Sequence, residues 1–441
     1  MFKFEFEHFF LCCILVKNIR MNYPHHYIII LLVLLSNTVF SQNVEVQIQK
    51  NIGTVQIFNP KTNDNTPIIK LNSDEKLIFL FDDLNGGYTR YNYKIEHRNA
   101  DWSESNIFQS EYLIGLPSDY VKTHKNSFNT FKKYTNYQIE FPNTQMNVKL
   151  AGNYLLKVYT NNENKPVFTK KFAIYQGNVE VGIQFSRYIN PTKPEFNQRL
   201  QTTVSSQYQN LLETADGAKL FVMKNNNWAD SKTNLRPDFS RNNQLTYNNL
   251  EWTFEGGSEY NWFDNKNLEI NGLTTERTFR KDSVYHTILR VDVPKYNYPY
   301  DDFGDINGNF FIRNNRFGNE YLASSEADYS WVYFALDNFD DQNGLYEPYV
   351  VGAFNNWEIS NLSKLKFNEE SKLWENELFL KQGYYNYQYV VKNTRTNLIE
   401  TSYVDGSFWQ TENIYQGLFY YRPWGGRYDI LMGYGEVNTR K

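Results

Sequence analysis

Hydrophobic and polar positions alternate along most of this chain. Val44, Val46 and Ile48 are separated by polar residues, as in a strand with one buried face. Clusters rich in Asn, Asp and Gly, such as 82–87 and 161–166, separate the alternating runs and indicate turns. The runs that predict strands include 77–81, 91–97, 154–159, 167–175, 179–185, 200–205, 219–223, 244–250 and 287–293. No helical pattern longer than about ten residues interrupts them, so the chain is predicted to be all-β.

The spacing of these runs and turns is typical of antiparallel sandwiches. A first series of strands ends near Gln176, and a second series begins at Val179. We therefore predict three β-sandwich domains in tandem, at residues 42–176, 177–326 and 327–441. In the last domain, the runs 374–380 and 384–391 are expected to pair as a hairpin.

The N-terminal segment reads as a secretory signal peptide. Its apolar run, 27–35, is much shorter than the roughly 20 residues that span a bilayer. Val39 and Ser41 supply the short side chains of a cleavage site, which predicts a signal peptide at residues 1–41, cleaved after Ser41. Met21 is an alternative start, and a membrane anchor is the alternative interpretation. Both cysteines, Cys12 and Cys13, precede this site, so the mature chain must rely on core burial without disulfides.

Composition and motifs give no sign of catalysis. The formal net charge of −4 is mild and no long basic run is present, which argues against a nucleic-acid partner. The histidines after residue 41, His97, His124 and His286, lack metal-ligand spacing, and no Gly-x-Ser-x-Gly elbow occurs. We predict neither an enzyme nor a bound cofactor.

Two acidic segments, 301–308 and 337–344, raise the question of calcium. Placing either glycine at the sixth position of a calcium loop puts a phenylalanine at the first position, where a carboxylate is required. Both segments are better explained as turns in which Asp and Asn side chains bond their own backbone. No metal site is predicted.

A Gly-x-Phe-Asn-x-Trp sequence, Gly352 to Trp357, closes a predicted strand and resembles the early-set, immunoglobulin-like sandwich of glycogen-binding modules. In such modules an exposed Trp stacks on a sugar ring, and Trp357 is the matching position. Trp409 and Asn413 are candidates for the second aromatic residue and the polar clamp. The structural alternative, which we favour, is that Phe354 fills the core while 355–357 form a covering turn.

Further distinctive segments follow one another in order across residues 42–436. They are 95–102, 110–113, 128–130, 141–143, 151–154, 256–264, 305–308, 380–390, 411–413, 421–423 and 426–429. Together they resemble the type IX secretion system plug proteins. None of these motifs is catalytic.

The resemblance implies a non-enzymatic protein of the periplasm, associated with the outer membrane. Such a protein binds the large outer-membrane translocon β-barrel and closes its periplasmic opening, so contact with the membrane is expected only through this partner. Exposed aromatic turns are the candidate contacts, namely Tyr298, Tyr300 and Trp424. The alternative function is a periplasmic or surface glycan-binding protein that uses Trp357.

Overall fold

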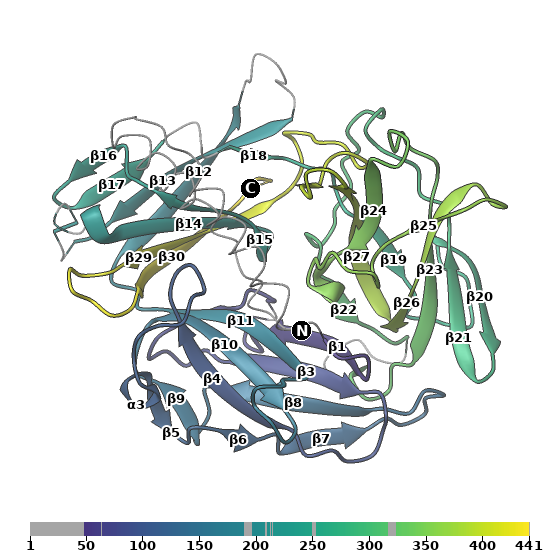
Figure 1. Ribbon diagram of the computed structural model, residues 1–441, viewed down its shortest axis with the longest axis horizontal. Coiled ribbons are helices and arrows are strands. Elements are labelled where there is room, and N and C mark those ends of the chain that lie inside the picture. The colour runs from purple at the N-terminus through teal and green to yellow at the C-terminus, as the bar shows by residue number, and fades with distance from the viewer. Residues whose placement is uncertain are drawn as a thin grey trace, which may run out of the picture. The chain divides into compact units, whose positions relative to one another are not determined.

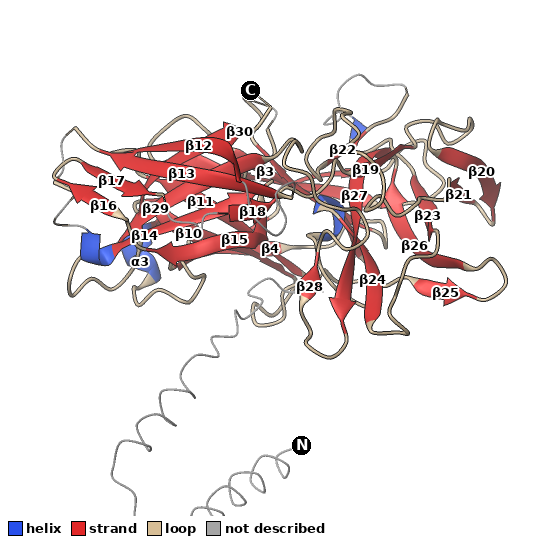
Figure 2. Cartoon of the chain, turned by 90° about the horizontal axis from the view of Figure 1, so that it is seen from above, coloured by secondary structure: helices blue, strands red, loops and turns tan. Residues whose placement is uncertain are grey.

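The computed structural model describes residues 48–440, apart from 63, 189–195, 208–209, 212, 214, 249–252 and 316–322. The predicted signal peptide, with its alternative start at Met21, and the strand at 44–46 lie outside the described residues. Strands dominate the described chain, and its helices are short (Figure 2). The prediction of an all-β chain built from sandwiches is confirmed.

The first sandwich consists of two facing sheets. One sheet contains, in spatial order, β1 (Ile52–Phe58), β3 (Leu77–Asp83), β8 (Thr135–Phe141) and β7 (Thr123–Asn126). The other contains β2 (Ile68–Lys70), β11 (Phe168–Tyr175), β10 (Gly152–Tyr159), β4 (Asn92–Arg98) and β6 (Asp119–Tyr120). A short helix, α3 (Gln109–Tyr112), precedes a separate two-stranded sheet of β5 (Leu113–Gly115) and β9 (Met146–Val148). Phe79, Ile95 and Tyr154 belong to the core between the two large sheets.

The second sandwich combines strands that are far apart in the sequence. One sheet contains β12 (Glu180–Tyr188), β13 (Asn197–Ser205), β17 (Gln244–Tyr247) and β16 (Phe239–Arg241), with β18 (Thr253–Glu255) also paired to β13. The other contains β15 (Asn227–Leu235), β14 (Ala218–Lys224), β29 (Ile414–Tyr421) and β30 (Ile430–Asn438). The 3-10 turn η1 (Ala215–Gly217) leads into β14. Figure 1 shows the yellow strands β29 and β30 alongside the teal β14.

The third sandwich is formed by the strands between these two parts of the second. One sheet contains β19 (Asn261–Asp264), β27 (Gly383–Asn393) and β22 (Phe310–Ile312), and β24 (Tyr346–Val351) and β28 (Ile399–Glu400) also pair with β27. The other contains β20 (Thr275–Lys281), β21 (Val284–Leu289), β23 (Tyr329–Leu336), β26 (Leu373–Lys381) and β25 (Lys366–Asn368). The turn η2 (Ala353–Asn355) follows β24.

The second and third sandwiches each take strands from both of the segments 177–326 and 327–441. β29 and β30 fall in the later segment but complete a sheet of the second sandwich, whereas β19 to β22 fall in the earlier segment but belong to the third. β14 and β29 form backbone hydrogen bonds with each other, and their apolar side chains share the second core. Both strands therefore depend on this pairing between distant parts of the sequence.

The hairpin predicted for 374–380 and 384–391 is wrong, although both strands are present. β26 pairs with β23 and β25, while β27 pairs in the opposite sheet. Gln382 alone connects them, and one residue is too short for a two-residue hairpin turn. Its backbone N–H donates to the carbonyl oxygen of Asp328 over 2.7 Å, and its side-chain oxygen accepts from the Asp328 N–H over 2.7 Å. The chain therefore crosses from one sheet to the other at this point.

Alternation along the sequence marks the strands that have one buried face, whereas β3 and β10 are buried on both faces. In β13, Leu200 and Val204 lie in the core, while Arg199 and Gln201 are half-exposed on the other side. The same alternation explains why the local pattern locates strands but does not identify their partners.

Candidate functional site: sandwich junctions and an anchored tryptophan loop

A buried ion pair joins the first and third sandwiches. Lys381, at the end of β26, places Nζ 2.6 Å from Oδ2 of Asp82 in β3, and both side chains are at most 1% exposed. The Tyr329 hydroxyl donates to the same oxygen over 2.7 Å, and the Asn136 amide donates to the other over 2.7 Å. Lys381 also lies 4.0 Å from the ring centre of Tyr134. Burial lowers the pKa of Lys381, and the charge of Asp82 opposes this shift.

A polar cluster around Asp429 joins the first and second sandwiches. Its carboxylate accepts from Lys219 Nζ and Arg422 Nε, each over 2.9 Å, and from the backbone N–H of Ala100 over 3.0 Å. Arg422 Nη2 donates in turn to the side-chain oxygen of Asn99 over 2.8 Å. Burial alone would raise the pKa of Asp429, but these bonds hold that pKa below its ordinary value. The carboxylate is therefore charged where the two sandwiches meet.

An apolar core lies beside this polar cluster. Ala173 of the first sandwich packs with Phe221, Leu418 and Leu431 of the second. The two sandwiches thus bury their facing sheets against each other as well as sharing hydrogen bonds.

The loop between β29 and β30 is tied to the first sandwich and carries a fully exposed tryptophan. Arg427 pairs with Glu111, and the backbone N–H of Asn106 donates to the carbonyl oxygen of Arg427 over 3.3 Å. Arg422 and Asp429 lie at the two ends of the loop, and both belong to the polar cluster described above. Trp424, between them, has a fully exposed side chain. Anchored in this way, a large apolar ring is held in solvent.

The two candidate tyrosines differ in exposure. Tyr298 is 57% exposed, in a loop whose backbone bends back so that the Tyr298 N–H donates to the Lys295 carbonyl oxygen. The Tyr300 hydroxyl instead donates to the buried carboxylate of Glu259, and its ring centre lies 5.6 Å from that of Phe408. Tyr300 is therefore half-buried and held by these contacts, and Tyr298 is the more exposed residue of the pair.

The Gly-x-Phe-Asn-x-Trp segment forms the covering turn that we favoured. Phe354 packs against the third core, with its ring centre 5.9 Å from that of Tyr385. The side-chain oxygen of Asn355 accepts from the Gly352 N–H over 3.0 Å, which closes the turn. Asn356 and Trp357 both have positive φ, so the backbone leaves the turn in a left-handed conformation.

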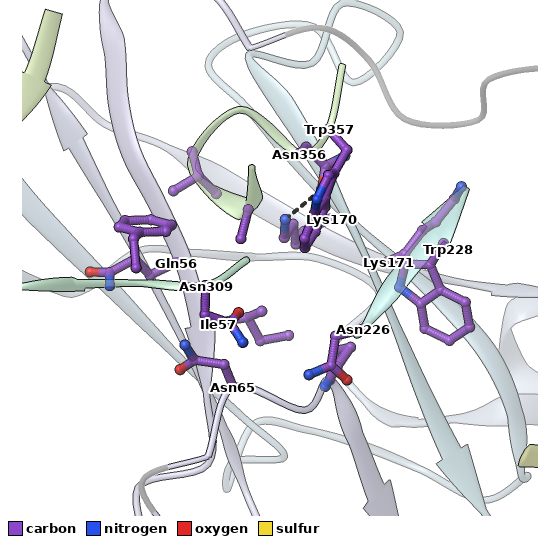
Figure 3. Close-up of a pocket in the computed structure, with 14 residues that line it drawn as sticks. Gln56, Ile57, Asn65, Lys170, Lys171, Asn226, Trp228, Asn309, Asn356 and Trp357 are labelled. Carbon is purple, nitrogen blue, oxygen red and sulfur yellow. Dashed lines mark hydrogen bonds between the residues drawn. The ribbon is translucent and has the colours of Figure 1, made fainter. Parts of the chain in front are cut away.

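The three glycan candidates occupy different environments. Asn413 is 2% exposed, and its amide donates to the Gln198 side chain over 3.0 Å and accepts from the Asn225 amide over 2.8 Å. Trp409 is half-buried, with the Arg187 guanidinium 5.1 Å from its ring centre. Trp357 lines a pocket (Figure 3) to which neither of the other two contributes.

The acidic segments form turns, as predicted. In one, Asp341 accepts from the backbone N–H groups of Asn343 and Gly344, each over 3.1 Å. In the other, Asp305 accepts from the Asn307 N–H over 2.7 Å. Within the described ranges, no group of three or more His, Cys, Asp or Glu side chains could hold a metal ion.

Comparison with known proteins identifies the family. Residues 52–176, which form the first sandwich, match the family model described as the type 9 secretion system plug protein first domain. A crystal structure of a hypothetical protein from Parabacteroides merdae ATCC 43184 is 30% identical in sequence. The match covers 89% of this chain and 98% of that protein, with a TM-score of 0.84. The chain belongs to the type IX secretion system plug protein family. A search of the curated proteins finds no match.

Membership in the plug family indicates a role in type IX secretion and a location at the cell envelope. In the part of the chain that the structure describes, no helix is long and apolar enough to cross a membrane.

Sequence reasoning missed the buried contacts between sandwiches. Asp82 and Lys381 are 299 positions apart, and each stands in an ordinary strand pattern. No local signal connects them, because charge complementarity between distant strands becomes visible only once the fold places them together.

Proposed function

We propose that this member of the plug family is a non-enzymatic periplasmic protein that binds the large outer-membrane translocon barrel and closes its periplasmic opening. Export by a signal peptide cleaved after Ser41 is part of the proposal. The family match carries it, and the structure adds two supporting features. The sandwiches share buried polar and apolar contacts, which suit a rigid seal. The anchored Trp424 offers a pre-positioned aromatic contact, and such residues dominate interface energetics.

The experiment that tests this function is recovery of the partner. The mature protein, tagged after Lys441, is captured from envelopes solubilised in mild detergent, and bound proteins are identified by mass spectrometry. We expect a very large outer-membrane β-barrel in near-equal amount. A clean deletion should also make the envelope leaky to large antibiotics. An intact barrier in the deletion strain, or retention on a glucan column without recovery of a barrel, would contradict the plug function.

A further inference from the structure

A buried carboxylate lies where the chain passes between the second and third sandwiches. Residues 256–260 lead from β18 to β19, and residues 401–413 lead back from β28 to β29. The carbonyl oxygen of Gly257 accepts from the Phe408 N–H and from the Thr411 hydroxyl, each over 2.7 Å, so these two linkers lie side by side. Together they form what we call the linker crossing.

Glu259 joins the linker crossing to the loop 295–305. Its Oε1 accepts from the Tyr300 hydroxyl over 2.5 Å and from the backbone N–H of Glu412 over 3.0 Å. Its backbone carbonyl oxygen accepts from Lys295 Nζ over 3.0 Å. This one residue therefore holds both linkers and the loop together.

The other oxygen of this carboxylate is buried without a partner. Glu259 is 2% exposed, and its Oε2 forms no hydrogen bond with any described residue. A charged oxygen in this position has lost water without gaining a donor, which is costly. Burial therefore favours the neutral, protonated form and raises the pKa of Glu259, while the bonds from Tyr300 and Glu412 oppose the shift.

Asp305 is a second carboxylate at this crossing, on the side of the loop. It accepts from the Tyr260 N–H over 2.6 Å and from the Asn307 N–H over 2.7 Å. Burial raises its pKa to about 7, and the charges of Glu259 and Glu412 add to this rise. Ionisation of Glu259 and ionisation of Asp305 therefore oppose each other.

The other charged groups at the crossing already have partners. The ion pairs are Arg440 with Glu412, Arg440 with Asp302, and Lys224 with Asp230. The charge of Arg440 lowers the pKa of Glu259, but burial outweighs it. Asp405, in the returning linker, accepts from the Tyr389 N–H over 2.9 Å within the third sandwich.

We propose that Glu259 is a proton-dependent latch for the loop 295–305. With its proton, the carboxyl group holds the loop against the linker crossing. Its ionisation places a bare negative charge beside Asp305 and Glu412, and the loop then separates so that water reaches this charge. The latch is a property of this chain alone and goes beyond the proposed function. One consequence rests on that function: because the exposed Tyr298 lies on the loop, the proton controls whether this candidate contact is held in place for the barrel.

The sign of the effect follows from the raised pKa values. Glu259 and Asp305 each bind a proton more tightly in the closed state than in water. Closure is therefore fully supported below their ordinary pKa values of 4.5 and 3.8, and it weakens as the pH rises through about 7. For one group with a closed-state pKa near 7, the open fraction rises about tenfold between pH 6 and pH 8.

Hydrogen exchange of the purified protein at pH 6, 7 and 8, followed by mass spectrometry, tests the latch. The main reporter is the backbone N–H of Glu412, which donates to Glu259, and the Tyr260 N–H reports on Asp305. Each rate is divided by the intrinsic exchange rate at the same pH. We expect protection at both reporters to fall about tenfold from pH 6 to pH 8, while β10 of the first sandwich keeps its protection.

Glu259→Gln separates the proton from the structure. Its amide oxygen still accepts from Tyr300 and Glu412, and its amide nitrogen takes the position of Oε2. Protection at Glu412 should then change less than threefold over the same pH range, because the acceptor of this N–H no longer titrates. Glu269→Gln changes an exposed glutamate of the third sandwich and should behave as the wild type does.

Tyr300→Phe is a second test, which also serves if Glu259→Gln lowers the thermal unfolding midpoint. It removes the hydroxyl that Glu259 holds, so the loop should already be open at pH 6. The N–H of Tyr298, which donates to the Lys295 carbonyl oxygen, reports on the loop and should lose at least fivefold in protection. Tyr298→Phe, which alters an exposed ring, is the control and should leave this protection unchanged.

The outcomes separate the latch from the proposed function. Equal pH dependence at Glu412 in the wild type and Glu259→Gln, or unchanged loop protection in Tyr300→Phe, would overturn the latch. Binding to the barrel is measured at pH 6 and pH 8 in parallel. If exchange shows the latch but binding is the same at both pH values, the consequence for Tyr298 fails and the latch stands. If the wild type binds no barrel at either pH, the proposed function fails, whatever exchange shows.

Discussion

At Lys381 a positive charge is buried against Asp82, and removing either partner leaves the other without compensation. Lys381→Met should therefore lower the free energy of unfolding by about 3–5 kcal/mol, the usual cost of breaking a buried pair. Urea denaturation followed by tryptophan fluorescence measures this loss.

Two further variants isolate the cause. The double change Asp82→Asn with Lys381→Met removes both charges and should recover part of the lost stability. Lys372→Met breaks an exposed pair with Glu369 and should cost less than about 1 kcal/mol. Equal effects of Lys381→Met and Lys372→Met would show that the buried pair does not hold the first and third sandwiches together.

Asp292 gives the stability a pH dependence of known sign. Burial raises its pKa to about 6 from an ordinary 3.8, while hydrogen bonds from the hydroxyls of Tyr387 and Tyr389 oppose the shift. Because the folded protein binds this proton more tightly than the unfolded chain, the contribution to stability is complete below pH 3.8. It is lost as the pH rises to about 6.

The variant Asp292→Asn removes this titration. Relative to wild type, it should gain on the order of 3 kcal/mol between pH 4 and pH 8, with the gain at the higher pH. Urea unfolding at pH 4, 6 and 8 measures the difference. Asp282→Asn, in an exposed turn, is the matched control. Parallel stability curves for wild type and Asp292→Asn would refute the assignment.

At the scale of single elements, the local sequence pattern predicted where strands lie but not which strands pair. Alternation located β13 because one-sided burial leaves its mark on consecutive residues, whereas β3 and β10 are buried on both faces and appear as largely apolar runs. It did not reveal that β14 pairs with β29, since strand partners distant in sequence share no local signal. The covering turn at 355–357 could be predicted from the sequence, whereas the pocket beside it could not. The turn is built from neighbouring residues, and the pocket draws on three sandwiches.

The exchange of strands between segments predicts the effect of a truncation. A chain that ends at Asn413 lacks β29 and β30, which removes Tyr415, Phe419 and Met432 from the second core and leaves β14 without one neighbour. Hydrogen exchange should show loss of protection in β12, β13 and β14, while β3 and β10 of the first sandwich remain protected. A chain that ends at Thr439 is the control. Retained protection in β13 after the longer truncation would contradict the role of β29.

At the scale of the whole molecule, the buried contacts between sandwiches fix the arrangement of the surface that a partner would contact. The Asp82–Lys381 pair and the core around Leu418 fix surfaces contributed by distant parts of the chain. A docking protein benefits from this, because ordering a flexible surface on binding would reduce the affinity. Under the proposed function, docking is therefore expected to depend on junction residues as well as on exposed ones.

Among exposed residues, Trp424 and Tyr298 are the ones whose loss should weaken docking. Neither contributes much to any core, so the double variant Trp424→Ser with Tyr298→Ser should unfold at the wild-type temperature. Its affinity for the barrel should fall at least tenfold, since aromatic contacts at interface centres each account for about 2 kcal/mol or more. Surface plasmon resonance with the detergent-solubilised barrel measures the change.

Phe239→Ser is the control for this experiment, because Phe239 is 51% exposed on β16 and takes no part in the anchored loop. If that variant weakens binding as much as the Trp424 and Tyr298 pair, general surface hydrophobicity governs docking. If only Trp424→Ser has an effect, the anchored loop is the contact and the Tyr298 loop lies outside it. Unchanged binding in the double variant would place the docking face on another part of the surface, because a fully exposed ring that contacts the barrel cannot be removed without cost.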